Sequence, residues 1–91
     1  MSYKIKPLNW EIEQRSSGEI HTSEVMGILF EIKHRTGEKP VLTIKSLGAD
    51  RFEFPETLEA AKELAEGINK AMISHFVESM YNNLAKEYSI P

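Results

Sequence analysis

The feature that most restricts the fold is a change in hydrophobic period between Phe52 and Lys62. Before this stretch, apolar and polar residues alternate, which is typical of β-strands with one buried face. After it, apolar residues recur every three or four positions, which is typical of an amphipathic helix. The sequence therefore predicts a sheet over residues 1–54 and a helical region over residues 56–88.

The residues before this change predict short antiparallel strands. The clearest alternation covers residues 26–35, in which Gly27 indicates a β-bulge or a close backbone approach. Residues 41–45 are its predicted partner, with Leu42 and Ile44 on the inner face. Shorter candidate strands cover residues 3–6, 10–14, 20–22 and 51–54. Short connections favour an antiparallel meander, because parallel pairing needs long crossovers.

The residues after the change predict one long helix. Thr57 is the expected N-cap, because its hydroxyl can accept a hydrogen bond from a free amide of the first turn. A helix of about 30 residues is ~45 Å long, whereas a strand of about seven residues spans only ~23 Å. The helix is therefore expected to extend well beyond its sheet.

The apolar face of this helix shifts along its length. The first half carries a stripe that is expected to cover the sheet: Leu58, Ala61, Ala65, Ile68 and Met72. A second stripe, rotated by about a third of a turn, has the same spacing: Ile73, Val77, Met80 and Leu84. Two interpretations stay open for the second stripe. It completes the same core after a break near Ile73-Ser74-His75, or it contacts another protomer.

These patterns predict a single α+β domain of 91 residues. Its architecture is an antiparallel meander of three to five strands, with one face covered by the C-terminal helix. The predicted core combines apolar residues of both regions: Trp10, Ile12, Met26, Ile28, Phe30, Ile32, Leu42, Ile44, Phe52, Phe54, Leu58, Ala61, Ala65 and Ile68.

The composition limits the cellular compartment and the kinds of reactive site that we expect. The chain has no cysteine, which excludes disulfides, thiolate zinc sites and cysteine nucleophiles and fits a reducing cytosol. Its first residues lack the apolar run of a signal peptide. No apolar run approaches the ~20 residues that span a membrane. We therefore expect a cytoplasmic protein.

Sequence motifs give little support for catalysis. The three histidines, His21, His34 and His75, lie on three different predicted elements and form no H-E-x-x-H pattern. No nucleophile elbow or S-x-x-K motif surrounds any serine. The paired carboxylates have the spacing of solvated faces. The sequence predicts a non-enzymatic protein without catalytic, metal-ligating or cofactor-binding residues.

Charge is segregated along the chain. Residues 33–51 contain five basic and two acidic residues, whereas residues 53–66 contain five acidic residues and one basic residue. One hypothesis is that the basic hairpin contacts a nucleic-acid backbone through Lys33, Arg35, Lys39 and Lys45. The other interpretation is charge on edge strands that prevents aggregation.

The leading hypothesis is a small cytosolic binding or regulatory protein that contacts another protein or a second copy of itself, through the end of the predicted helix or through the sheet edge. Tyr and Met are enriched in protein interfaces. The end of the predicted helix supplies such a surface: Ile73, Phe76, Val77, Met80, Tyr81, Leu84 and Tyr88. The other interpretation is that these residues complete the core of the monomer.

Three stretches carry a resemblance to a known group: Trp10, residues 27–32 (GILFEI) and the spaced pattern Phe54, Leu58-Glu59, Ala61-Lys62 and Ala65. In these residues the chain resembles small uncharacterised proteins of phages and prophages. The resemblance covers roughly residues 8–70 and implies a sheet followed by a helix and a phage origin. It implies no catalytic or binding residue, and the tail from Ile73 onward is longer than in that group.

Overall fold

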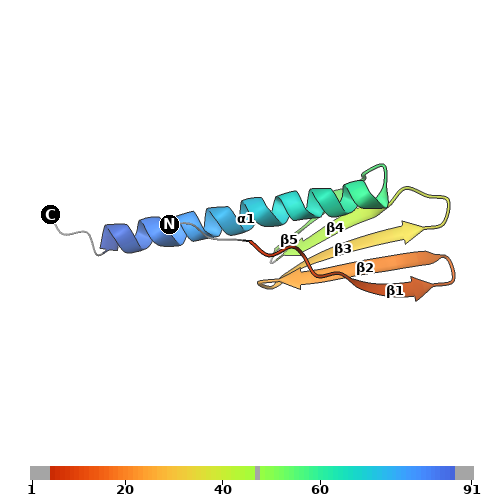
Figure 1. Ribbon diagram of the computed structural model, residues 1–91, viewed down its shortest axis with the longest axis horizontal. Helices are drawn as coiled ribbons and strands as arrows, with labels where there is room; N and C mark the ends of the chain where they lie inside the picture. Colours follow the sequence, from red (N-terminus) through yellow and green to blue (C-terminus); the bar gives the residue numbers. More distant parts are fainter. Residues whose placement is uncertain (1–4, 47, 88–91) are drawn as a thin grey trace.

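A computed structural model describes residues 5–46 and 48–87 of the chain, with side chains as far as Tyr81. Five strands pair in sequence order in one antiparallel sheet, and one long helix follows them (Figure 1). The elements are β1 (Glu11–Arg15), β2 (Gly18–Val25), β3 (Ile28–Arg35), β4 (Val41–Ser46), β5 (Ala49–Glu53) and α1 (Leu58–Glu87). This arrangement confirms the predicted α+β meander.

Two tight turns set the register of the first three strands. Ser16 and Ser17 connect β1 to β2, where Arg15 pairs with Gly18. Met26 and Gly27 connect β2 to β3, where Val25 pairs with Ile28. The predicted bulge at Gly27 is therefore wrong, and so is the alternative of a close backbone approach, because a Cβ atom at Gly27 would meet nothing within 4 Å. Both turn residues have positive φ, 53° and 80°, which is the geometry of a type I′ hairpin turn.

The core lies between α1 and the two central strands. Phe30 and Ile32 of β3 are fully or nearly fully buried, as are Leu42 and Ile44 of β4, because these residues share the face that α1 covers. Two alanines on α1, Ala61 and Ala65, are also fully buried. Their small side chains let the helix backbone approach the sheet closely.

The segment before β1 packs beside α1 and is not a strand over Ile5 and Lys6; the rest of the predicted strand over 3–6 lies outside the described residues. Leu8 is buried in the core, which the sequence did not predict. Its amide donates a hydrogen bond of 2.8 Å to Glu66 Oε1 of α1. Lys62 Nζ lies 6.0 Å from the centre of the Trp10 ring, within cation–π range.

Four predicted core residues are exposed instead. Ile12 pairs with His21 and shares its face, but β1 is an edge strand beyond the reach of α1. Phe52 pairs with Thr43 and so lies on the face opposite the helix, while Phe54 follows the end of β5. Met26 belongs to the β2–β3 turn. Alternation separates two faces of a strand, but it does not say which face the helix covers.

Helix α1 begins as the sequence predicts and is longer than the sheet. Thr57 Oγ1 accepts a hydrogen bond of 3.0 Å from the amide of Ala60, which confirms the N-cap. The helix is continuous through Ile73-Ser74-His75, so the alternative with a break there is wrong. Because its second half runs past the sheet, the molecule is elongated, with extents of 63 × 27 × 20 Å (Figure 1).

Candidate protein-interaction surface

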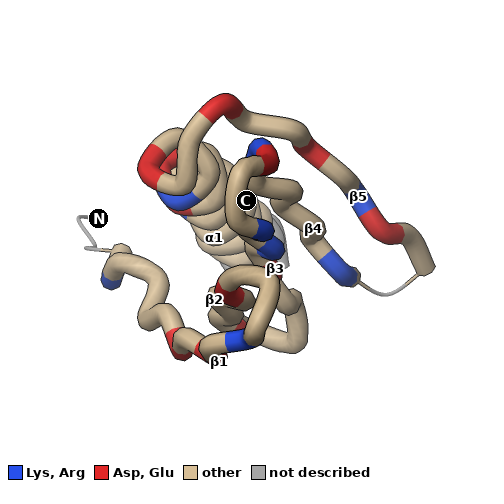
Figure 2. Tube along the Cα trace, turned by 90° about the vertical axis from the view of Figure 1, so that its right-hand side faces the viewer, with Lys and Arg blue, Asp and Glu red and all other residues tan. Residues whose placement is uncertain are grey.

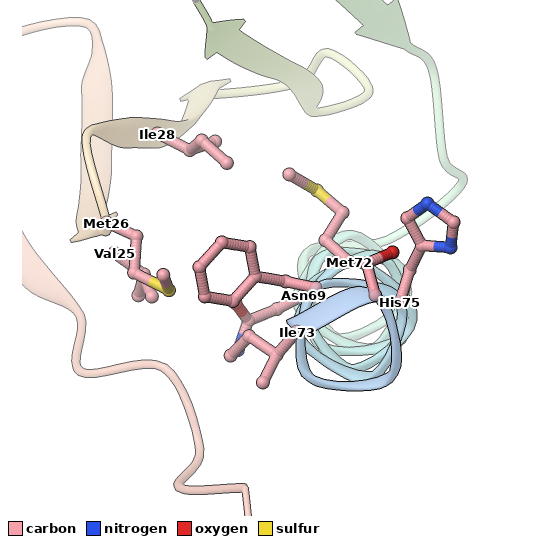
Figure 3. A pocket seen from close by; sticks show the side chains of 9 residues that line it. Val25, Met26, Ile28, Asn69, Met72, Ile73 and His75 are labelled. Atoms are coloured by element: carbon pink, nitrogen blue, oxygen red, sulfur yellow. The ribbon is translucent and has the colours of Figure 1, made fainter. Parts of the chain in front are cut away.

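An apolar groove lies where α1 leaves the sheet, between the helix and the β2–β3 turn. Its volume is about 420 Å³. Figure 3 shows the turn residues on one side and the helix residues on the other, with Met72 pointing toward Ile28 and His75 directed away from the turn. The lining residues are Val25, Met26, Ile28, Asn69, Met72, Ile73, His75, Phe76 and Ser79. None of these nine is Lys, Arg, Asp or Glu.

The helix side of the groove continues the face that packs on the sheet. Ala61, Ala65 and Ile68 cover the sheet, and Met72 and Phe76 follow them at intervals of four residues. Beyond Met72 the described part of the sheet no longer covers this face, and Phe76 is 47% exposed. The groove is thus the uncovered end of a stripe whose first half belongs to the core.

Met26 forms the opposite rim of the groove and is held in an unfavourable backbone conformation. Its φ is 53°, in the left-handed region, and its side chain is 63% exposed. The first position of a type I′ turn favours Asn, Asp or Gly, and a bulky residue there costs about 1–2 kcal/mol. Neither local preference nor burial in the monomer explains a methionine at this position.

The predicted interface residues are brought only partly together. Ile73 and Phe76 line the groove, while Met80 and Tyr81 are 48% and 56% exposed farther along α1. Val77 is half-buried and does not line the groove. The side chain of Leu84 and the whole of Tyr88 lie outside the described residues. Met26 and Asn69, which the sequence did not mark as interface residues, complete the groove; a methionine before Gly27 in a two-residue turn was the available signal.

The four residues of the predicted basic surface have different surroundings. Lys33 and Lys45 lie on neighbouring strands and share one carboxylate, Glu31, at 3.5 and 3.7 Å. Lys39 Nζ lies 3.0 Å from Glu56, which immediately precedes the N-cap. Figure 2 shows acidic residues beside basic ones on β1 and β5. These pairs neutralise much of the charge that a phosphate backbone would contact.

Arg35 borders a polar hollow of about 310 Å³ at the β1–β2 turn, together with Arg15 and Lys33. Gly18 pairs with Arg15 on one side and Arg35 on the other, so no side chain stands between the two arginines. A Cβ atom at Gly18 would lie 2.2 Å from the carbonyl oxygen of His34. Close backbone approach therefore requires glycine here, and the hollow follows from it.

Strand β2 places three polar side chains on the face toward α1. His21 is 2% exposed, and its Nε2 donates a 2.8 Å hydrogen bond to Glu19 Oε2. This bond lowers the pKa of Glu19. His21 Nδ1 and Ser23 Oγ are buried without a hydrogen-bond partner. Glu19, His21 and Ser23 have the residue types of a catalytic triad. However, no hydrogen bond joins Ser23 to His21, and the serine is only 4% exposed, so Ser23 is not arranged as a nucleophile.

Residues 5–46 and 48–87 hold no group of three or more His, Asp or Glu side chains placed to bind a metal ion. Within the same ranges, no helix has both the length and the apolar character needed to cross a membrane.

No family model, curated protein or solved structure matches this chain. The resemblance to phage and prophage proteins therefore stays a prediction.

Proposed function

We propose that this protein is a non-enzymatic binding protein that acts by contact with another protein chain. The contact surface, called the groove surface below, consists of the nine residues that line the groove together with Met80. Tyr81 lies on the same side of α1 as Lys70, away from the groove, because the two are 11 residues apart on the helix. The observation that carries the proposal is the uncovered apolar face of α1 opposite the exposed Met26.

The composition of the groove surface supports protein contact over a soluble ligand or nucleic acid. Met, Phe and Tyr are enriched in protein interfaces, and the core of an interface is depleted in charge. The exposed apolar residues adjoin one another at the groove, and contiguous apolar patches mark interaction sites more often than scattered ones do. The alternative, nucleic-acid binding, has less support because three of its four candidate residues pair with carboxylates.

The first test asks whether the groove surface belongs to the monomer core. We expect the double variant Phe76→Ser, Met80→Ser to lose less than about 1 kcal/mol of unfolding free energy, because both side chains are already about half exposed. The core variant Phe30→Ala should lose about 3–5 kcal/mol. Urea unfolding of the monomer measures both. A loss in the double variant as large as in Phe30→Ala contradicts the proposal.

The second test asks what touches the surface. A photo-crosslinking amino acid replaces Phe76, and in a matched control it replaces Phe52, which is 56% exposed on β5. We expect irradiation of the protein in its native cells to join position 76, but not position 52, to a protein chain. The absence of any crosslinked chain from position 76 contradicts the proposed function.

A further inference from the structure

We infer that the polar hollow at the β1–β2 turn is a binding site for the phosphate group of a small phosphate monoester. The site is separate from the groove surface, because the β1–β2 turn and the β2–β3 turn lie at opposite ends of β2 (Figure 1). The inference therefore does not rest on the proposed protein contact. Three features support it: two arginines that flank a glycine, a backbone that holds them in place, and an arginine without an ion-pair partner.

Two arginines stand on either side of Gly18. Arg15 of β1 pairs with Gly18 of β2, which in turn pairs with Arg35 of β3. Neighbouring strands are about 4.8 Å apart, so the backbones of the two arginines are ~10 Å from each other, with no side chain between them. Arg35 is three residues from the buried Ile32, so this row is on the face of the sheet away from α1. Lys33 lies on the same face and also borders the hollow.

Hydrogen bonds hold the backbone around the hollow. The amide of Thr36 donates a 2.9 Å hydrogen bond to the carbonyl of Ser17, which ties the β1–β2 turn to the end of β3. The amide of Glu38 donates a 3.1 Å hydrogen bond to the carbonyl of Arg35, so the chain after this arginine is held as well. The spacing of the two arginine backbones is therefore set before any ligand binds, which reduces the ordering cost of binding.

The positive charge of the hollow is only partly neutralised. Within the part of the chain that the structure describes, Arg35 forms no ion pair with a carboxylate. Arg15 contacts Glu13 through its Nε at 3.0 Å, which engages one of the five N–H donors of a guanidinium group. Lys33 lies 3.5 Å from Glu31. The hollow thus retains one unpaired guanidinium and most of the donors of a second.

Glu19 is the only acid among the described residues that line the hollow, and its carboxylate is engaged elsewhere. Its Oε2 lies 2.8 Å from His21 Nε2, and its Oε1 accepts a 3.1 Å hydrogen bond from Gln14. Glu19 pairs with His34 and belongs to the face toward α1. It therefore does not stand between the two arginines.

These groups match a phosphate monoester better than a carboxylate or a phosphodiester. Guanidinium groups bind phosphate through paired, charge-assisted hydrogen bonds. A monoester carries nearly two negative charges and three acceptor oxygens, enough for two arginines and a lysine at once. Ser16 and Ser17 also line the hollow, and a hydroxyl can donate a further hydrogen bond. A volume of about 310 Å³ is at the small end of ligand sites, which suits a small molecule and not a polymer.

An NMR titration of the full-length chain tests the site. The probes are inorganic phosphate and glycerol phosphate, which replace chloride at constant ionic strength. We expect both probes to shift the amide signals of residues 15–18 and 33–36 and to leave those of residues 69–79, beside the groove, unchanged. Acetate should bind at least about tenfold more weakly, because it has one charge and two acceptor oxygens.

Arginine variants test the contacts. Arg35→Gln should raise the dissociation constant for glycerol phosphate at least about tenfold, and Arg15→Gln should have an effect in the same direction. Arg35→Lys should also raise the constant, because an ammonium group keeps the charge but loses the paired N–H donors. The matched control is Arg51→Gln, which removes the same charge from β5 outside the hollow and should leave the constant within about twofold. Unchanged amide signals elsewhere in each variant show that the fold is kept.

Three outcomes overturn the inference: no saturable shift with either probe, equal binding by Arg35→Gln and the wild type, or an equal loss in Arg51→Gln. The last probe is a single-stranded oligonucleotide without a terminal phosphate. If it binds more tightly than glycerol phosphate and its binding is weakened by Lys39→Gln and Lys45→Gln, the surface contacts a polymer backbone and the small-molecule site is discarded.

Discussion

At the scale of single residues, the most consequential polar group is the Glu19–His21 pair on β2. Burying His21 removes its ring from water, and the 2.8 Å bond to Glu19 Oε2 satisfies only one of its two nitrogens. The carboxylate is the more exposed partner. The buried His21 ring is therefore hydrogen-bonded to a carboxylate that itself contacts solvent.

The lowered pKa of Glu19 predicts a pH-dependent contribution to stability. The pKa in the folded state lies below the ordinary value of 4.5, chiefly because His21 hydrogen-bonds to the carboxylate. The contribution is therefore complete above 4.5 and is lost as the pH falls through the folded-state pKa. We expect Glu19→Gln to flatten the dependence of the urea midpoint on pH below this value. Glu24→Gln, on the opposite face of β2, is the control and should retain the wild-type slope.

Ser23 predicts a stabilising substitution. Its hydroxyl is buried without a partner, and an unpaired buried hydroxyl costs about 1–3 kcal/mol. We expect Ser23→Ala to raise the unfolding free energy by about 1 kcal/mol. Ser46 is the matched control, because its hydroxyl donates a 3.1 Å hydrogen bond to the carbonyl of Ala49, so Ser46→Ala should lower stability slightly. A loss of stability in Ser23→Ala would show that the hydroxyl has a partner in solution.

At the scale of elements, the sequence predicted most of what local chemistry controls. Thr57 caps α1 as expected. Phe30, Ile32, Leu42 and Ile44 face the helix, because the charged residues of the two central strands occupy the other face. The buried face of the edge strands was harder to predict. Phe52 belongs to a strand whose inner face carries Arg51 and Glu53, so the pairing with β4, and not the apolar pattern of β5, decides that Phe52 is exposed.

The groove could be predicted only in part, for a similar reason. Spacing located the helix side at Ile73 and Phe76. The sheet side depended on where the second hairpin turns. Alternation continued from Met26 into β3 without interruption, so the turn looked like a bulge in one long strand. The predicted strand therefore began two residues before β3, which moved Met26 from the groove rim into the predicted core.

Two glycines on different elements predict opposite effects of the same substitution. Alanine at Gly18 would place Cβ 2.2 Å from the His34 carbonyl oxygen, a contact that the paired backbones cannot relieve. We expect Gly18→Ala to cost about 3 kcal/mol or more. Gly67 is an exposed helix residue with open space where a Cβ would lie, so Gly67→Ala should stabilise by about 1 kcal/mol. Thermal melts compare the two, and equal effects would contradict the close approach at Gly18.

At the scale of the whole molecule, the sheet and the helix do not match in length. The core is confined to the region where α1 crosses β3 and β4, and the helix continues past it to Glu87. Helical segments of this length are marginal in water without tertiary contacts. The second half of α1 therefore depends on a partner for much of its stability, which links the elongated shape to the proposed contact with another protein chain.

Hydrogen exchange should detect this dependence. We expect amides of residues 73–81 of the isolated chain to exchange at least about tenfold faster than amides of residues 61–69, because the described part of the sheet covers only the earlier range. Amides of residues 61–69 thus supply the internal control. Equal protection of the two ranges in the isolated chain would mean that the monomer alone stabilises the helix end, and that the groove surface has no structural need of a partner.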